Sequence, residues 1–581
     1  MKNPRLNFIL LIIVIVLFGM FIKLISFDIV KAENTYTEKI PALRGNIYDR
    51  RGRLLALSYP VYVAYFDVKF FKEYYNPSYE NDIEHLENNF NIKMDLNKQF
   101  IKLGESIDRE FLLKKVPPSL LPFVSLESQE KRKFVGSFGL NNIVGNVRDH
   151  QGISGIEKYF NDFLSPKQNG MIKVSYSGFF SLSATISDYS PPVNGNNLNL
   201  TIDSDLQALM YAIAEDSLKK YSAESVGIIV METNTGKLRS IVTTRRWPDF
   251  IMGYIEPGSS LKPIFYAAML DLGVVTPDST YNCQGYIYPD PDIDIKITDI
   301  HAHGLLDLTG AIARSCNVAA ILTSKKLVKM YGEEKLYDVL ISFGFGAPTG
   351  VELPGEISGI LRKVENWSKI DWAYIPIGYS IGVTPLQLIS AFNAVVNDGI
   401  YVSPTLIEGK SVVRRRVVSK KSARIILSTL REVVKSGTGI LANVPGVAVY
   451  GKTGTAEKKP GSGEYYMIFE GYFKSSEKQY TVLVWIDNPE GYTLAGNVAA
   501  PIFAKIVKAI VNQQQRNKRL LVTPGVVPDL KGWNIRQLES LARYFKIKIK
   551  SKGYYVISQN PSPGNISEEI EVNLSFSYPE N

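Results

Sequence analysis

The stretch EPGSSLKPIFYAAMLDL, residues 256–272, holds a turn, a serine and a lysine ahead of an apolar run. Its Pro-Gly pair indicates a turn, and the run 264–272 is apolar enough for a buried helix. Pro263 fits the first turn of that helix, where N–H groups have no partner within the helix. We therefore expect Ser259 at a helix N-terminus, with Lys262 one turn further along the same face.

Two further motifs follow in chain order, Ser315-Cys316-Asn317 and Lys452-Thr453-Gly454-Thr455. The second comes after the strand-like segment 447–451, so we expect it on a strand whose backbone is available to a ligand. Alone, Ser315 and Asn317 would indicate only a helix N-cap or a buried polar pair. The ordered set of three motifs is typical of serine enzymes that are acylated by penicillin-like or D-Ala-D-Ala substrates.

Three other segments match one of these patterns by chance. Ser217…Lys220 lies in a charged stretch that indicates a solvated helix end, and Ser475…Lys478 lies in a polar hairpin. Lys435-Ser436-Gly437-Thr438 follows a helical pattern over 423–434, and its glycine resembles a helix C-cap. We expect none of the three to be catalytic.

A serine hydroxyl is a poor nucleophile and needs a base. None of the four histidines has the sequence context of a Ser-His-Asp triad. Lys262 can serve if its amine is neutral, and both burial and a second cation, Lys452, would lower its pKa. We therefore predict Ser259 as the nucleophile and Lys262 as its base.

The other motif residues suit a substrate that carries an amide and a carboxylate. Ser315 can relay a proton between the lysine amine and a leaving group, and Asn317 can hydrogen-bond a substrate amide. Thr453 and Thr455 offer hydroxyls to a carboxylate, for which Lys452 supplies the charge.

No metal site and no cofactor are expected from the sequence. His301-Ala302-His303 lies in a loop-like segment, with no carboxylate or thiol recognised at zinc spacing, and is interpreted as surface or packing residues. The two cysteines, Cys283 and Cys316, make no disulfide framework. A single bridge is the alternative, but free thiols are favoured because Cys316 sits between two predicted site residues.

Length and charge leave room for several domains. The 581 residues carry a net charge of +9, and 45% of them are hydrophobic. The positive excess is spread out, which suits anionic surfaces such as lipid headgroups or cell-wall polymers. Because there is no dense basic stripe or nucleic-acid motif, no nucleic-acid partner is expected.

The N-terminus predicts a membrane anchor. Residues 6–25 form an apolar segment, broken by only two polar residues, that is long enough to span one hydrocarbon core. Lys2 and Arg5 precede it, so we expect a single pass through the cell (inner) membrane, with the N-terminus cytoplasmic and the bulk of the chain outside. Cleavage near Val30-Lys31-Ala32 is the alternative, but this site lies far past the apolar core.

Composition changes mark further boundaries along the chain. A Pro-, Gly- and Asn-rich segment, 190–197, precedes a mixed α and β pattern, and the polar stretch 513–519 is interpreted as a linker. The last unit, from Thr523, is expected to hold one helix, 534–544, followed by three strands. These strands are predicted over 546–550, 554–559 and 570–577.

Through these motifs the chain resembles a class B penicillin-binding protein, a peptidoglycan D,D-transpeptidase. Further segments carry the resemblance: Arg44-Gly45…Asp49-Arg50…Gly52, Gly152-Ile153-Ser154-Gly155-Ile156-Glu157, Thr384-Pro385-Leu386-Gln387 and, similar to a PASTA domain, Val527-Pro528-Asp529-Leu530-Lys531-Gly532. One departure is the segment 239–248, which is more polar than the family's usual apolar strand.

The resemblance implies an α+β multidomain fold. Its parts are a cytoplasmic tip and transmembrane helix (1–30), an elongated, dimerisation-type pedestal (31–195), a transpeptidase domain (196–515) and a small α/β PASTA domain (523–581). In the transpeptidase domain we expect a central antiparallel sheet flanked by helices.

The resemblance also implies the reaction and its partners. Ser259 attacks the D-Ala-D-Ala carbonyl of one stem peptide, D-alanine leaves, and an amine of a neighbouring stem resolves the acyl-enzyme into a crosslink. Backbone N–H groups of Ser259 and Thr455 form the oxyanion hole. The implied partners are peptidoglycan stem peptides, β-lactams as inhibitors, the membrane and a membrane glycosyltransferase of the division machinery. The modest region before the catalytic domain favours a division or sporulation role over elongation.

Other functions share these motifs. A D,D-carboxypeptidase, with water as acceptor, would carry every one of them, as would a β-lactamase or a β-lactam sensor. The pedestal and the anchor argue against a free β-lactamase. A catalytically silent wall-binding scaffold is opposed by the intact Ser259, Lys262 and Lys452.

Overall fold

A computed structural model describes residues 4–29, 34–136, 138–177, 183–476, 478–518 and 526–575, the last range without 534, 536–537, 539–540 and 542–544. The chain forms two compact units. Unit 1 comprises residues 1–46, 56–134 and 162–197, and unit 2 comprises 47–55, 135–161 and 198–581.

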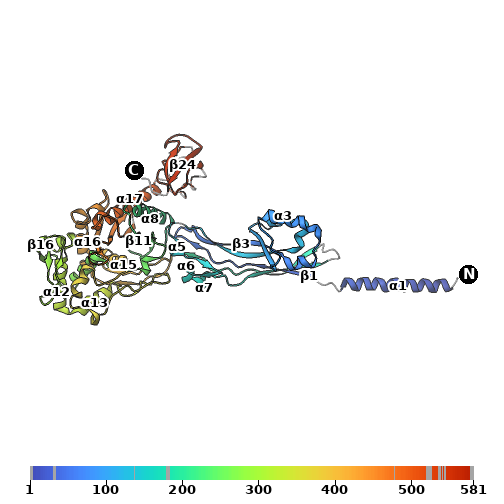
Figure 1. Ribbon diagram of the computed structural model, residues 1–581, viewed down its shortest axis with the longest axis horizontal. Coiled ribbons are helices and arrows are strands. Elements are labelled where there is room, and N and C mark those ends of the chain that lie inside the picture. Colours follow the sequence, from blue (N-terminus) through green and yellow to red (C-terminus); the bar gives the residue numbers. More distant parts are fainter. Residues whose placement is uncertain are drawn as a thin grey trace. The chain divides into compact units, whose positions relative to one another are not determined.

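The chain begins with helix α1, Pro4–Ile29 (Figure 1). Within the described part of the chain, no helix is both long and apolar enough to cross a membrane.

Unit 1 is built on two sets of antiparallel strands. The first set has the order β1-β8-β9, with bounds Asn34–Ile40, Gly170–Ser177 and Ser183–Ser190. In the second, β3 (Leu54–Asp67) pairs with β4 (Phe100–Ser106) and with β5 (Val124–Phe134). Helices α2 (Val68–Glu73), α3 (Glu80–Phe90) and α4 (Arg109–Lys114) accompany this second set. Phe66, Phe71 and Phe123 lie at the centre of its core.

Unit 2 is built on a five-stranded sheet of order β12-β11-β21-β20-β19, in which every pair is antiparallel. The strands are β11 (Ser225–Glu232), β12 (Leu238–Thr243), β19 (Val449–Glu457), β20 (Tyr465–Ser475) and β21 (Lys478–Asp487). The expected central antiparallel sheet is therefore confirmed. β19, which carries the Lys-Thr-Gly-Thr motif as predicted, is an edge strand.

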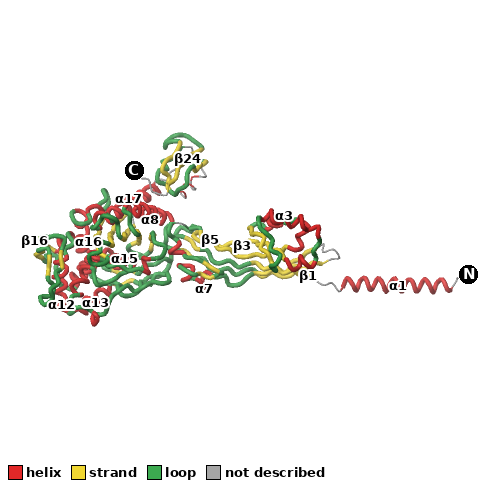
Figure 2. Tube along the Cα trace, in the orientation of Figure 1, coloured by secondary structure: helices red, strands yellow, loops and turns green. Residues whose placement is uncertain are grey.

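Helices cover both faces of this sheet, and in Figure 2 they surround its strands. α8 (Ser204–Lys220) and α17 (Ala499–Lys518) pack on the face that includes Val482. α15 (Pro385–Val396) lies on the opposite face, because Thr481 donates to Asn393 Oδ1 (2.6 Å) and neighbouring strand residues point to opposite faces. The other helices are α5 (Asn141–Val144), α6 (Gly155–Tyr159), α9 (Asp249–Met252), α10 (Lys262–Asp271), α11 (Leu308–Ala313), α12 (Asn317–Tyr331), α13 (Glu333–Ser342), α14 (Asp371–Tyr374) and α16 (Lys420–Lys435).

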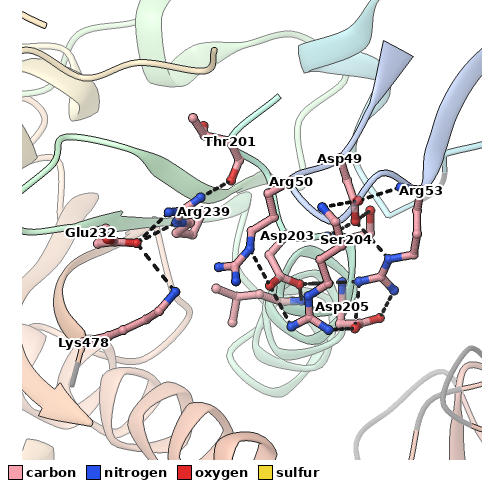
Figure 3. Close-up of polar contacts among 12 residues, drawn as sticks. Asp49, Arg50, Arg53, Thr201, Asp203, Ser204, Asp205, Glu232, Arg239 and Lys478 are labelled. Atoms are coloured by element: carbon pink, nitrogen blue, oxygen red, sulfur yellow. Dashed lines mark hydrogen bonds and ion pairs between the residues drawn. The ribbon is translucent and has the colours of Figure 1, made fainter. Parts of the chain in front are cut away.

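The polar strand β12 is fully buried. Ion pairs to its arginine explain how a charged residue can be buried there (Figure 3). The Arg239 guanidinium donates to Glu232 (2.7 Å), to Glu408 (2.8 Å) and to the carbonyl oxygen of Thr201 (3.0 Å). A buried charge is tolerated when it is paired and hydrogen-bonded in this way. The segment 239–248 is more polar than the family's usual strand, and partners on neighbouring segments neutralise the charge that this brings into the core.

The turn around Asp49 contacts the N-terminus of α8 (Figure 3). Asp49 Oδ2 accepts a hydrogen bond from the Ser204 hydroxyl (2.7 Å), and Arg53 pairs with Asp205 (2.6 Å). Asp203 caps the helix by accepting its first free N–H groups. Part of the Arg-Gly…Asp-Arg…Gly pattern therefore serves to hold this turn on α8.

The C-terminal segment 526–575 has a three-stranded sheet of order β22-β24-β23, close to the strands predicted there. Their bounds are Lys546–Ile549, Glu569–Ser575 and Tyr555–Asn560. The helix expected over 534–544 lies largely outside the described residues. Helix α17 continues through 513–518, so most of the stretch that was interpreted as a linker is helical. Polar residues extend that helix because no glycine or proline interrupts it before Pro524.

Candidate active site

The predicted nucleophile lies on a tight turn beside the edge strand. Ser259 belongs to the 3-10 turn η3 (Gly258–Leu261), which runs directly into α10. Gly258 has a φ of +53°, and a Cβ there would lie 2.5 Å from the carbonyl oxygen of Thr455 on β19. Only glycine fits this approach without displacing the turn. The serine is therefore held against β19.

Lys262 is fully buried, and its amine has acceptors on two sides. Nζ donates to the carbonyl oxygen of Ser315 (2.5 Å) and to Oδ1 of Asn317 (2.7 Å). Burial lowers the pKa of Lys262 to about 8, although the Asp299 carboxylate opposes this shift. A neutral amine has two hydrogens, which these acceptors engage, and its lone pair stays available for a proton.

Lys452 lies on the edge strand β19, and its amine contacts Ser315, the serine that also contacts Lys262. Its Nζ donates to Ser315 Oγ (2.9 Å), and Lys262 Nζ lies 3.5 Å from that hydroxyl. Burial holds the pKa of Lys452 well below its usual range, the charge of Lys262 lowers it further, and Glu470 opposes both effects. The hydroxyl of Ser315 therefore connects two buried amines.

Ser315 and Asn317 occupy the junction between α11 and α12. Ser315 has a φ of +63°, a conformation that a residue with a Cβ rarely adopts. This bend directs both its carbonyl and its hydroxyl toward Lys262. Asn317 donates from Nδ2 to the carbonyl oxygen of Thr298 (3.0 Å), which orients its amide so that Oδ1 faces the lysine.

Ser259, Ser315 and Asn317 line a cleft of about 290 Å³. On its other side the hydroxyls of Thr438 and Thr453 lie 2.8 Å apart, and Thr455 Oγ1 accepts from the backbone N–H of Ala495 (3.1 Å). In the described sheet β19 pairs with one neighbour only, so its outer backbone edge lies open. The cleft thus offers hydroxyls and a strand edge to an extended ligand.

The structure brings the residues of all three motifs together. They are Ser259, Lys262, Ser315, Asn317, Lys452, Thr453, Gly454 and Thr455. The chance matches are occupied elsewhere: the Ser217 hydroxyl donates within α8 (2.7 Å, to Ile213), and Ser475 is paired with Lys478 at a hairpin end.

Three parts of the cleft were not predicted from the sequence: Asp299 with Ile300, Thr438, and the loop 494–497. Thr438 ends the Lys-Ser-Gly-Thr segment that was set aside because it follows a helical pattern and its glycine resembles a helix C-cap. Lys435 does end α16, but the threonine three residues on enters the cleft. Only its contact with Thr453, from a distant segment, identifies it.

Family models match most of the chain. Residues 226–508 match the penicillin binding protein transpeptidase domain, 39–200 the penicillin-binding protein dimerisation domain, and 525–578 the PASTA domain. The chain is a class B penicillin-binding protein.

Relatives of this penicillin-binding protein share about a quarter of its residues. Stage V sporulation protein D of Bacillus subtilis is 28% identical over 484 residues, which cover 75% of this chain and 73% of the relative. The peptidoglycan D,D-transpeptidase FtsI of Escherichia coli is 28% identical over 521 residues, covering 84% and 86%.

Solved structures share the fold. Penicillin-binding protein 3 of Mycobacterium tuberculosis, in complex with ampicillin, has a TM-score of 0.61 at 24% identity and covers 84% of this chain and 98% of its own. Penicillin Binding Protein 2X of Streptococcus thermophilus has a TM-score of 0.65 at 17% identity and covers 93% and 100%.

Proposed function

We propose that this penicillin-binding protein is a peptidoglycan D,D-transpeptidase that crosslinks stem peptides in septal cell-wall synthesis. The observation that carries the proposal is the pair of buried lysines joined through Ser315 next to the turn of Ser259. A serine nucleophile needs a neutral base, and burial makes the neutral amine of Lys262 accessible by lowering its pKa to about 8. The E. coli relative named as a peptidoglycan D,D-transpeptidase supports the substrate class.

Acylation follows from this geometry. Ser259 Oγ attacks the carbonyl carbon of the penultimate D-alanine while its proton passes to Lys262 Nζ. When the C–N bond breaks, the proton moves through the Ser315 hydroxyl to the leaving nitrogen, and D-alanine departs. The backbone N–H groups of Ser259 and Thr455 are assigned to the transient oxyanion.

The second half of the reaction reverses the proton path. An amine from a neighbouring stem peptide attacks the ester carbonyl and loses a proton toward Lys262. The ester C–O bond breaks, and Ser259 recovers its hydroxyl hydrogen. One amide replaces another, so no external energy source is required. A D,D-carboxypeptidase would differ only in admitting water at this step.

The edge of β19 and its hydroxyls are assigned to substrate binding. An extended peptide can add to the strand edge through its backbone, which is how exposed edges commonly bind peptides. The terminal carboxylate then meets Thr453 and Thr455, with Thr438 beside them. Lys452 supplies charge, because a bound carboxylate favours its protonated form.

We also propose that residues 6–25 anchor the chain by a single pass, with a cytoplasmic N-terminus and the catalytic part outside. The support is the apolar run and the Lys2 and Arg5 that precede it. A membrane glycosyltransferase of the division machinery would supply the strands to be crosslinked. β-Lactams are the expected inhibitors, in line with the ampicillin and aztreonam complexes of the mycobacterial relative.

A labelled penicillin tests the nucleophile. The wild-type chain and Ser260→Ala should form a covalent adduct that peptide mapping places on Ser259. Ser259→Ala should form none. An adduct that persists on Ser259→Ala, or that maps to Ser217, would contradict the assignment. Incubation with paired stem peptides then separates crosslinked product from the hydrolysed product of a carboxypeptidase.

A further inference from the structure

Four side chains with metal-ligand chemistry meet beside the Ser315 turn. They are Cys283, Asp299, His303 and Cys316, whose ligand atoms all lie within 4.8 Å of one another. Cys283 Sγ is 3.4 Å from His303 Nδ1 and 3.5 Å from Asp299 Oδ2, and the last two atoms are 3.9 Å apart. Both cysteines are buried free thiols, and the side chains of Asp299 and His303 are 2% exposed.

The backbone builds this cluster from separate segments. Strands β13 (Thr280–Cys283) and β16 (Gly304–Asp307) pair so that Cys283 lies opposite Gly304. The N–H of His303 donates to the carbonyl oxygen of Cys283 (3.1 Å), which holds these two residues side by side. Cys316 lies at the N-terminus of α12, as its N-cap residue. The spacing along the chain therefore conceals the cluster, and no metal was expected from the sequence.

We propose that Cys283, Asp299, His303 and Cys316 bind one structural zinc ion. Bonds of about 2.3 Å to sulfur and about 2.0–2.2 Å to nitrogen or oxygen place the ligand atoms of a tetrahedral zinc site roughly 3.3–3.8 Å apart. The three separations among Cys283, Asp299 and His303, 3.4–3.9 Å, are close to that range, and Cys316 Sγ lies within 4.8 Å of each of the other ligand atoms. Four protein ligands close the coordination sphere, as in structural rather than catalytic zinc sites.

The chemistry of the set favours zinc over other divalent ions. Two thiolates and an imidazole are soft or intermediate ligands, which calcium and magnesium avoid. Metal binding requires that both thiols lose their protons to solvent, and burial then protects the thiolate–metal bonds. The remaining ligand, a carboxylate, is common in tetrahedral zinc sites.

Helix capping is the simpler explanation for part of this cluster. Asp299 Oδ2 accepts the N–H groups of Asn317 (2.8 Å) and Val318 (3.3 Å), as an N-cap carboxylate does. Capping also explains Cys316, the N-cap residue of α12, whose Sγ accepts the N–H of Ala319 (3.3 Å). It gives no reason for the Cys283 thiol and the His303 ring nitrogen to face the same carboxylate.

The proposed ion has a defined consequence for the cleft. It would tie Asp299 and Cys316 to the paired strands β13 and β16, and Asp299 in turn holds the backbone of Asn317. The proposed ion would then hold in place the turn that presents Ser315 and Asn317 to Lys262. The four ligands are positioning residues, and the metal readout below is independent of the proposed transpeptidase function.

The full chain, purified under reducing conditions, provides the test. Its zinc content is measured by inductively coupled plasma mass spectrometry. In a second measurement cobalt(II) replaces zinc, because cobalt bound to the site gives an absorption spectrum that reports its ligands and geometry. We compare wild type with Cys283→Ser and His303→Gln. The matched control is His301→Gln, because its ring lies 4.3 Å from that of His303 but belongs to none of the four ligands.

We expect one zinc ion per chain in wild type and in the His301 control. Zinc affinity should fall at least about 10-fold in Cys283→Ser and His303→Gln. Wild type with cobalt should show thiolate-to-metal charge transfer and the visible bands of a tetrahedral ion. Because this spectrum is taken on the wild-type chain, it decides the proposal even if a ligand variant fails to fold.

Three results would overturn the proposal. In the first, wild type takes up neither zinc nor cobalt after reduction. In the second, Cys283→Ser binds zinc as tightly as wild type. In the third, the isolated chain carries a Cys283–Cys316 disulfide and takes up no metal once that bond is reduced. If zinc binds as expected, removing it should slow acylation by penicillin, and adding it back should restore the rate.

Discussion

At the scale of single residues, the two buried lysines have different tasks around one hydroxyl. Lys262 must give up and regain a proton, whereas Lys452 has to present a charge to a carboxylate. Arginine can keep a charge but cannot act as a base. We therefore expect Lys262→Arg to lose roughly 10²–10⁴-fold in the rate of acylation by labelled penicillin. Lys452→Arg should retain more activity. Equal and mild losses at both positions would remove the assigned roles.

Lys262 also predicts a pH dependence. Its pKa is lowered to about 8, so the amine is protonated and inactive below that pH and neutral above it. The acylation rate of wild type should therefore rise as the pH increases through about 8 and then level off. The profile is measured by reacting the protein with labelled penicillin at neutral and alkaline pH, quenching the reaction at set times and correcting for hydrolysis of the penicillin. A flat profile would show that another group supplies the base.

At the scale of elements, the site depends on how closely η3 approaches β19. Gly258→Ala places a Cβ 2.5 Å from the Thr455 carbonyl oxygen, so the turn has to move. A shift of about 1 Å at a reacting atom costs roughly 10²-fold in rate, and we expect that loss in acylation.

Gly273→Ala is the matched control for this variant. Gly273 also has a positive φ, +69°, but no atom lies within 4 Å of its Cβ position. It should lose only about 1–2 kcal/mol of stability, seen as a lower Tm, while its acylation rate stays near wild type. Equal acylation rates for the two variants would show that the approach of η3 is not required.

The ion pairs of β12 make a separate prediction about stability. Arg239→Ala leaves the Glu232 and Glu408 carboxylates without their buried partner, which costs about 3–5 kcal/mol in comparable cases. Arg424→Ala, which removes an exposed pair with Asp398, should change stability by less than about 1 kcal/mol. Differential scanning calorimetry of both variants compares the Tm of the main transition. Similar Tm values would mean that β12 does not depend on Arg239.

Local signals explain which elements and site residues could be predicted. A Pro-Gly turn before an apolar run located Ser259, and a strand pattern located Lys452, because both features depend on neighbouring residues. Asp299 and Thr438 could not be found in this way. Each enters the cleft through contacts with residues distant in sequence, Asn317 and Thr453. The polar end of α17 was interpreted as a linker because of its composition. Composition alone does not end a helix, so this local signal was misleading.

At the scale of the whole molecule, catalysis and the C-terminal segment are expected to be separable. All three motifs are complete before Thr523, and the later residues bring no nucleophile with a neighbouring base. A chain that ends at Leu521 should react with penicillin at a rate within a few-fold of the full chain. Circular dichroism confirms that it is folded. A folded but unreactive chain would show that the C-terminal segment shapes the active site.

The open edge of β19 also bears on solubility. Proteins usually protect such an edge with proline, a bulge or a lysine that points outward, because an unpaired strand recruits strands of other molecules. An edge that must accept a peptide cannot be blocked in this way. Here η3 stands close beside the strand, so close that a Cβ on Gly454 would lie 2.8 Å from the Pro257 carbonyl oxygen. We therefore expect the turn that presents the nucleophile to narrow the approach to this strand, so that a single extended chain end reaches it more readily than the sheet edge of a second folded molecule.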